Sequence, residues 1–324
     1  MRQLLVLLAV FSAIAVLPAV ITSEFSLNIV IMMLYAALLG QAWNILGGYG
    51  GQFSFGHAAY FGTGAYAVAV LQVQLGINPW IGMVAGALLA MAVAAFIGFA
   101  TFRTGLRGSY FALVTLAFAE VLRILSNSVD FTGAGVGILI PLAPGPGNLQ
   151  FETKTGFFFL IWSFTLAAFL AVWWIGHSRF GASLAAVRDN EEAARALGVN
   201  AFRVKMGAII LSGLFGGLAG VFYAQYFLYL DPYIAYGPAI SVESLLVPII
   251  GGMGTLFGPL LGAVALHTVS ELTRELIGDV PGISLAIYGA LLVGMVLFLP
   301  RGLAGIAARF TRRNKPAGTE TRHA

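Results

Sequence analysis

The chain has 324 residues, of which 59% are apolar and only 9% are charged. A soluble domain carries about 25% charged residues, so water is excluded as the solvent for most of this surface. Cysteine is absent, which excludes disulfides and thiolate metal sites, and the four histidines show no metal-ligand spacing. The net charge of +4 would suit nucleic acid, but the placement of the basic residues argues against that partner.

Long runs without charge dominate the sequence, and residues 25–102 contain no Asp, Glu, Lys or Arg. About 20 residues of helix cross a bilayer core, and only helices or closed barrels span lipid. The runs are continuous rather than alternating in polarity, which favours helices. We therefore predict an all-α, polytopic transmembrane protein with about ten spans. The predicted spans are residues 4–22, 26–46, 56–76, 79–101, 109–126, 156–176, 206–228, 258–276 and 282–299, with a shorter apolar piece at 240–251.

Two of these segments have alternatives. Residues 240–251 form either a full span or one limb of a re-entrant hairpin. Residues 1–23 resemble a signal peptide in hydrophobicity, but the apolar core is long and no clean A-x-A cleavage site follows.

The basic residues predict the orientation. With the N-terminus inside, fourteen of the seventeen Lys and Arg residues lie on the inside, and acidic residues such as Glu24, Asp130 and Glu243 lie in outside loops. The basic tail is also inside if 240–251 crosses. We predict a bacterial inner-membrane protein with both termini cytoplasmic, a transmembrane domain at 1–305 with a cytoplasmic loop at 177–205, and a basic tail at 306–324.

Two glycine-rich strings interrupt the apolar runs, at 47–56 (GGYGGQFSFG) and at 251–259 (GGMGTLFGP). Unwound backbone survives in a membrane only where it is buried or lines a cavity, so paired breaks predict a faint internal repeat and a transporter core. The alternative is two tight turns between packed helices. The candidate pathway residues are Gln41, Asn44, Gly47, Gly48, Gly50, Gly51, His57, Gly251, Gly252 and Gly254. For Gln41 and Asn44 the alternative is hydrogen bonding between helices, and for His57 it is packing or helix capping.

The loop at 177–205 contains a short predicted helix with both ends specified. Asp189 is its predicted N-cap, with Glu192 three residues further on, and Gly198 is placed to end it. Asn200 is expected to cap the next helix. So short a helix is marginal in water and needs a surface to dock on, and Ala193, Ala194 and Leu197 are expected to share one face that fits a partner's groove. The alternative is an amphipathic helix lying on the membrane. The predicted coupling residues are Asp189, Glu191, Glu192, Ala193, Ala194, Leu197 and Gly198.

The same loop carries a family resemblance. Glu192-Ala193-Ala194, three residues and Gly198 resemble the "EAA" coupling loop of ABC importer permeases, which docks on the ATPase subunit. The family continues with nine residues and I-x-L-P, whereas this chain is one residue out of register at 209–212 and lacks the proline.

The resemblance extends along the chain. Residues 51–62 (GQFSFGHAAYFG), 108–117 (GSYFALVTLA) and 300–305 (PRGLAG) resemble segments of branched-chain amino acid permeases of the LivM type, in the same order. Residues 132–137 (TGAGVG) depart from the family's T-G-G-x-x-G-L.

The resemblance implies an ABC importer permease fold that forms half of a pathway for branched-chain or other small apolar amino acids. It implies a second homologous permease, two ATP-binding subunits and a periplasmic solute-binding protein. No G-x-x-x-x-G-K-[ST] loop occurs, so we expect no enzyme activity and no bound cofactor, with ATP hydrolysed by partner subunits. Loop 127–155 is the predicted docking place of the binding protein.

Two other functions remain open. Related permeases carry urea or short amides, and an ion-coupled secondary transporter would need an acidic residue within the membrane. Glu120 is the candidate for such an acid, but Arg123 is placed to pair with it at i,i+3.

Overall fold

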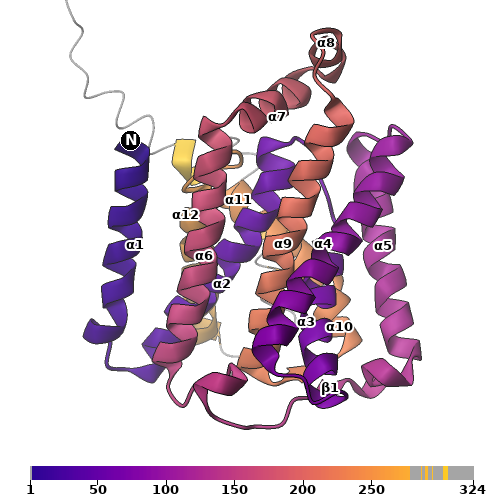
Figure 1. Cartoon of the computed structure of the whole chain (residues 1–324). Helices are drawn as coiled ribbons and strands as arrows, with labels where there is room; N and C mark the ends of the chain where they lie inside the picture. Colours follow the sequence, from indigo (N-terminus) through magenta and orange to yellow (C-terminus); the bar gives the residue numbers. More distant parts are fainter. Residues whose placement is uncertain (1, 278–285, 287–288, 291–293, 295–301, 306–324) are drawn as a thin grey trace, which may run out of the picture.

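The computed structural model describes residues 2–277, 286, 289–290, 294 and 302–305, and it shows a bundle of helices (Figure 1). Most of the predicted span 282–299 and all of the tail 306–324 lie outside the described residues. The helices are α1 (Arg2–Val20), α2 (Glu24–Trp43), the π-helical turn η1 (Asn44–Tyr49), α3 (His57–Val73), α4 (Pro79–Arg103), α5 (Gly108–Ser128), α6 (Lys154–His177), α7 (Arg179–Asp189), α8 (Glu191–Ala196), α9 (Ala201–Phe227), α10 (Pro232–Tyr236), α11 (Pro238–Gly251) and α12 (Gly258–Ile277).

Seven helical stretches among the described residues are long and apolar enough to cross a membrane. They are α1, α2 with η1, α4, α5, α6, α9, and α10 with α11. Helices α3 and α12 lie at two further predicted spans, although they are not among these seven. The all-α, multi-spanning class is therefore confirmed, while the count of ten spans and the internal repeat stay predictions.

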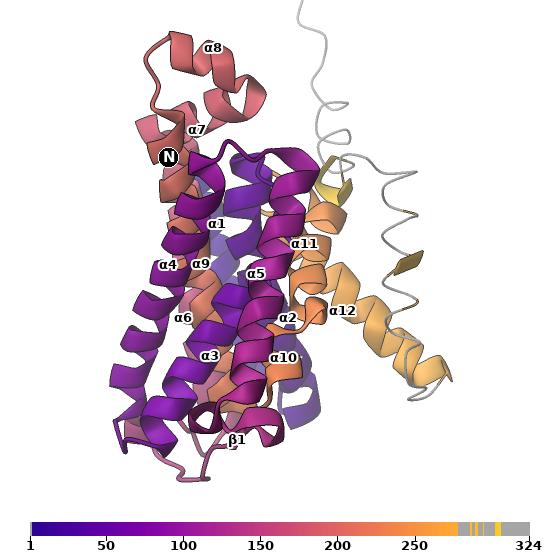
Figure 2. The same cartoon turned by 90° about the vertical axis from the view of Figure 1, so that its right-hand side faces the viewer.

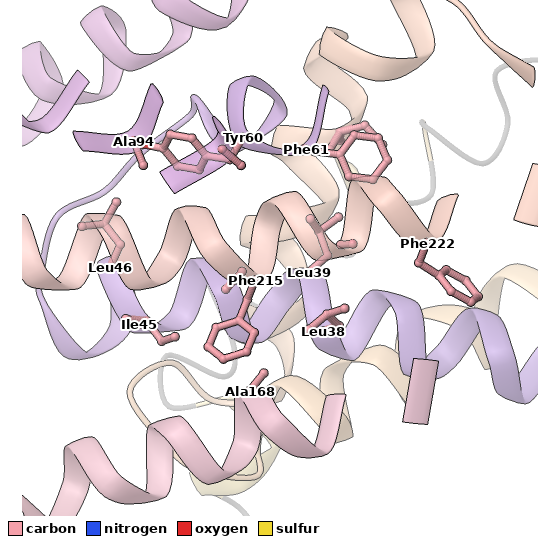
Figure 3. Packing of buried hydrophobic residues seen from close by; sticks show 14 of the residues in the cluster. Leu38, Leu39, Ile45, Leu46, Tyr60, Phe61, Ala94, Ala168, Phe215 and Phe222 are labelled. Carbon is pink, nitrogen blue, oxygen red and sulfur yellow. The ribbon is translucent and has the colours of Figure 1, made fainter. Parts of the chain in front are cut away.

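Small residues bring α3, α4 and α9 together at the centre of the bundle. A Cβ atom on Gly217 would overlap the Ala90 side chain, and one on Gly213 would overlap Ala94. Close approach of this kind is how helices associate in lipid, where apolar surface alone gives no preference for another helix. Figure 3 shows the adjoining core, in which side chains of α2 such as Leu38 lie beside Phe215 of α9.

The bundle has two distinct ends (Figure 1). Helices α7 and α8 project from one, which we call the α8 end. At the other, the strand end, β1 (Ile138–Leu139) pairs antiparallel with β2 (Tyr229–Leu230). The long loop 129–153 also holds three short 3₁₀ turns, η2 (Asp130–Thr132), η3 (Ala134–Val136) and η4 (Pro146–Asn148). Trp80 Nε1 donates to the Pro146 carbonyl at 2.8 Å, which ties this loop to the start of α4.

The stretch from α10 to α11 connects the two ends. Helix α10 packs against α5 and α3 next to the strands, and the chain after α11 reaches Asn44 at the far end of α2. This is the course that the crossing alternative for 240–251 requires. One expectation is corrected here: Glu243 lies in the second turn of α11, partly buried, and not in an outside loop. Prolines at the first positions of α10 and α11 start these helices earlier than the apolar pattern indicated.

Candidate functional site

Helix α8 is capped by a different residue from the predicted one. Asn190 is the N-cap, and its Oδ1 accepts from the backbone N–H groups of Glu192 at 3.1 Å and Ala193 at 3.0 Å. Asp189 instead ends α7, where it pairs with Arg188 Nε at 3.1 Å. Helix α7 was not predicted. Because it continues to Asp189, the first residue with the extended backbone of an N-cap is Asn190. The signal in the sequence for the start of α7 was Ser178, whose side chain accepts from Gly181 N–H as the N-cap of that helix.

The other end of α8 agrees with expectation. Gly198 has a φ of +85°, the left-handed conformation expected at a helix stop, and Asn200 Oδ1 accepts from Arg203 N–H at 3.0 Å to cap α9.

The predicted shared face of Ala193, Ala194 and Leu197 is wrong in one member. Ala194 is buried in a small cluster with Val187 of α7 and Ala201 of α9. Successive helical residues point about 100° apart, so Ala194 turns inward when Ala193 faces out. Ala193 and Leu197 are one turn apart and exposed, Leu197 to 85%. We call this exposed pair the α8 tip.

Glu191 holds α8 in place through three cations. Its carboxylate pairs with Lys205 of α9 at 2.6 Å, with Arg195 of α8 at 2.6 Å, and with Arg107 at 3.3 Å. The Lys205 and Glu191 side chains are only 5% and 10% exposed. Arg107 is the residue immediately before α5. One carboxylate thus joins α8 to both α9 and α5.

The charges around Glu191 determine its ionisation. Partial burial by itself would raise the pKa of this carboxyl group, but the hydrogen bond from Lys205 and the positive charges of Lys205, Arg107 and Arg195 outweigh burial and hold the pKa below its ordinary value. The carboxylate is therefore ionised at neutral pH, and its interactions persist into mild acid.

The two glycine breaks lie against each other at the α8 end. Asn44 Oδ1 accepts from Gly254 N–H at 2.8 Å, and its Nδ2 donates to the Thr255 carbonyl at 3.0 Å. Gln41 Nε2 donates to the Leu256 carbonyl at 3.3 Å. Both amide side chains are fully buried, so they join the breaks in the way that the helix-joining alternative describes.

Arg188 connects α7 to this pair of breaks. Its NH1 donates to the Gly48 carbonyl at 3.2 Å, and its side chain lies over Gly51. Gly51 has a φ of +66°, and a Cβ atom there would meet Arg188 Cγ at 2.5 Å. Gly51 thus has both the positive φ and the close approach that favour glycine.

The remaining predicted pathway residues lie inside the fold around these breaks. His57 Nε2 is 2.8 Å from Ser212 Oγ, and Ser212 donates its own proton to the Ala42 carbonyl at 2.7 Å, so His57 is the donor in this pair. His57 is a packed histidine at the start of α3. Gly47 and Gly50 allow close approach to the Trp43 ring and the Leu46 carbonyl, and Gly251 and Gly252 end α11.

A cavity that the sequence did not indicate lies between α5 and the α10–α11 segment. Its volume is about 240 Å³. It is lined by Leu116, Ala119, Glu120, Tyr236, Pro238 and Ser241. The predicted pairing of Glu120 with Arg123 is confirmed by two hydrogen bonds of 2.9 and 2.5 Å.

Apolar spanning helices and broken helices held against each other are typical of membrane transporters. The family described as "Branched-chain amino acid transport system / permease component" matches residues 25–296, and the chain belongs to this family. Together with the LivM relatives described next, this match confirms the resemblance to the LivM type.

Curated relatives agree. The chain is 31% identical to the LivM permease protein of the high-affinity branched-chain amino acid transport system of Salmonella typhimurium, over 93% of this chain and 75% of the relative. It is 30% identical to LivM of Escherichia coli over the same shares. The LivH permease protein of Salmonella typhimurium is 23% identical over 83% of this chain and 91% of the relative. No solved structure matches the chain.

Proposed function

We propose that this chain is the membrane-spanning permease subunit of an ABC importer and forms half of the translocation pathway for branched-chain or other small apolar amino acids. The observation that carries the proposal is the α8 tip: an exposed alanine and leucine on a short helix that Glu191 fastens to two spanning helices. An apolar tip on a fixed helix suits a groove on a partner protein.

The proposed partners rest on the relatives and on the two ends of the bundle. The chain is similar to both LivM and LivH, which are named as permease proteins of one kind of transport system, and this supports a second homologous permease as its neighbour. Two ATP-binding subunits would dock on the α8 tips, and a periplasmic solute-binding protein would dock at the strand end, over loop 127–155. This chain would bind no cofactor, because the ATP is hydrolysed on the partner subunits.

Two connections lead from the α8 tip into the membrane. Arg188, at the end of α7, holds the Gly48 carbonyl and so reaches the paired glycine breaks. Arg107 links Glu191 to the first residue of α5. A displacement of α8 by the ATPase would therefore act on both the breaks and the cavity beside α5.

Orientation is part of the proposal. The α8 end would be cytoplasmic, with ten spans and both termini inside, because the basic residues lie mostly on that side. A reporter that is active only in the cytoplasm should be active when it is fused at Ala324. Activity only of a periplasmic reporter would contradict the ten-span topology.

The coupling role is tested at the tip. Ala193→Asp should abolish transport by releasing or uncoupling the ATPases, because a charge does not fit a closely packed groove. Gly198→Val should act similarly, since a β-branched residue resists the left-handed conformation there. Ala182→Asp, at an exposed alanine of α7, is the matched control and should leave ATPase binding intact. Each variant is purified from membranes and assayed for bound ATPase and for cargo-stimulated hydrolysis in liposomes. Full binding and uptake in both tip variants would contradict the coupling role.

The cargo is tested separately by uptake. A deletion strain that carries this importer should accumulate labelled leucine and not labelled urea. Uptake of urea alone would contradict the amino-acid cargo and favour the alternative that this importer carries urea or short amides.

A further inference from the structure

The ion pair on α5 lies in an unusual place for two charges. Glu120 and Arg123 are in the second half of a 21-residue helix that is apolar enough to span a membrane. A charged side chain within the apolar part of a membrane is costly, so a pair there calls for an explanation. Neutralising each other reduces this cost, but it does not explain why Glu120 lines a cavity, which Arg123 adjoins through its hydrogen bonds to Glu120.

The pair still has free hydrogen-bonding capacity. Each Glu120 oxygen accepts one hydrogen bond from Arg123, from Nε and from NH2, and each oxygen has a second lone pair. The guanidinium has five donors, of which two go to Glu120. Its planar group lies 4.5 Å from the centre of the Tyr233 ring, which fixes its orientation from one side. The Glu120 side chain is 47% exposed and the Arg123 side chain 16% exposed.

The cavity beside Glu120 has both apolar and polar walls, which suit a small amphipathic ligand. Leu116, Ala119 and Pro238 give it apolar walls, while Glu120, Tyr236 and Ser241 add polar groups. Its volume of about 240 Å³ is below the roughly 300–1,000 Å³ of pockets for drug-sized ligands, so it suits a smaller solute. Figure 2 shows α5 beside α10, and the two helices are in contact.

We propose that this cavity is a cargo site and that Glu120 and Arg123 recognise the two charged ends of a zwitterionic amino acid. The inference rests on the proposed function and deepens it. The Glu120 carboxylate receives the α-ammonium group of the cargo, and the free guanidinium donors of Arg123 receive its α-carboxylate. The aliphatic side chain of the cargo packs against Leu116, Ala119 and Pro238.

The chemistry of the pair favours a zwitterion over an ion or a neutral solute. A lone cation or anion would compete with one member of the pair and leave the other without a partner in a poorly solvating environment. A zwitterion offers one charge to each member, so both remain compensated while it is bound. A neutral amide would gain little from either charge.

The chain's lack of cysteine gives a direct test. A Leu116→Cys variant places one thiol in the cavity, and Val136→Cys places one on an exposed residue of η3, outside the spanning helices and away from the cavity lining. In the purified complete transporter, a water-soluble thiol reagent should label both, and labelling is read on this chain after separation of the subunits. Leucine at 10 mM, in about the range of weak sites, should slow labelling at Leu116→Cys at least fivefold and leave Val136→Cys unchanged.

Leucine analogues that lack one charged group test whether both charges of the cargo are recognised. Isocaproate lacks the ammonium group and isoamylamine lacks the carboxylate, so neither should protect Leu116→Cys at the same concentration. Adding Glu120→Gln or Arg123→Lys should remove the protection by leucine. Arg123→Lys keeps the positive charge but loses the planar fork, so a merely structural ion pair would survive it and leave protection unchanged.

The outcomes separate the two proposals. Equal protection by leucine and both analogues, or no labelling of Leu116→Cys, would overturn the zwitterion site while leaving the importer assignment untouched. Import of urea but not of leucine by the unmodified transporter would overturn the proposed cargo itself. Protection by leucine alone, lost with Glu120→Gln, supports the site.

Discussion

Two glutamates in this molecule, Glu191 and Glu120, each pair with arginine, and their surroundings differ. Glu191 lies outside the spanning helices, is nearly buried and contacts three cations from three parts of the chain. Glu120 lies within a spanning helix, is half exposed and contacts one cation on the next turn of the same helix.

The difference separates a structural role from a binding role. A carboxylate surrounded by three cations has little capacity left for a ligand, and removing it leaves charges without partners. A carboxylate with one local partner and an open side keeps lone pairs that remain available to a solute. Burial and the number of partners, more than the presence of charge, therefore distinguish the α8 anchor from the proposed cargo site.

Removing the saturated carboxylate should have the largest effect on folding. Glu191→Gln leaves the buried ammonium of Lys205 without its anion, which should lower the free energy of unfolding by about 3 kcal/mol and loosen α8. ATPase retention during purification should fall in parallel. Glu192→Gln is the matched control, because that side chain is 85% exposed and lies 3.8 Å from Arg107. Its effect should be below about 1 kcal/mol. Equal effects of the two variants would remove the distinction drawn for Glu191.

The glycine break gives the next largest effect, and it tests the connection between α7 and the membrane. Gly51 and Gly76 have φ values of +66° and +64°, but only at Gly51 would a Cβ atom meet another side chain, that of Arg188. An alanine in this conformation costs about 1–2 kcal/mol at either position. Gly51→Ala should in addition displace Arg188 and impair uptake while the complex still assembles, and Gly51→Val should do so more strongly.

Uptake and coupled ATP hydrolysis in liposomes distinguish the two alanine variants. Unimpaired transport in Gly51→Ala would favour a simple turn, and loss of assembly would show that these glycines serve packing.

The pH dependence should follow from the lowered pKa of Glu191. Because the folded state lowers this pKa below the ordinary value of 4.5, the unfolded chain takes up the proton first as the pH falls. The contribution of Glu191 to stability is thus complete above about pH 4.5 and is lost as the pH drops through the folded-state pKa. Unfolding of the purified permease between pH 3 and pH 7, on the scale of ordinary carboxyl titrations, should show a smaller pH dependence in Glu191→Gln. Identical profiles would mean that the carboxylate is not held ionised by its neighbours.

The smallest change in stability is expected at Glu120. Glu120→Gln should alter the free energy of unfolding less than Glu191→Gln does, because Glu120 has one partner, on its own helix, and its side chain is 47% exposed. Leucine uptake should nevertheless fall. Thermal unfolding and uptake measured on the same preparation give the comparison with Glu191→Gln, and a large loss of stability would assign this pair to folding instead.

Much of the local structure followed from local signals. Uncharged runs predicted the spans because the bilayer core requires about 20 apolar residues in a helix. The stop at Gly198, the cap at Asn200 and the pairing of Glu120 with Arg123 involve residues at most four apart, so the backbone geometry of one helix decides them. The N-cap moved from Asp189 to Asn190 because an unpredicted helix, α7, ran up to it.

The sequence by itself therefore determined most of the spanning helices, the stop at Gly198 and the membrane as solvent, since each depends on neighbouring residues and on hydrophobicity. Only the tertiary structure decided that Asn44 joins the second glycine break, that Arg188 reaches Gly48, and that Arg107 and Lys205 meet at Glu191. It also placed Glu120 beside a cavity completed by residues more than 100 positions further along the chain. Partners so far apart in sequence meet only when helices pack, and packing depends on the shapes of whole helix faces, which no local pattern records.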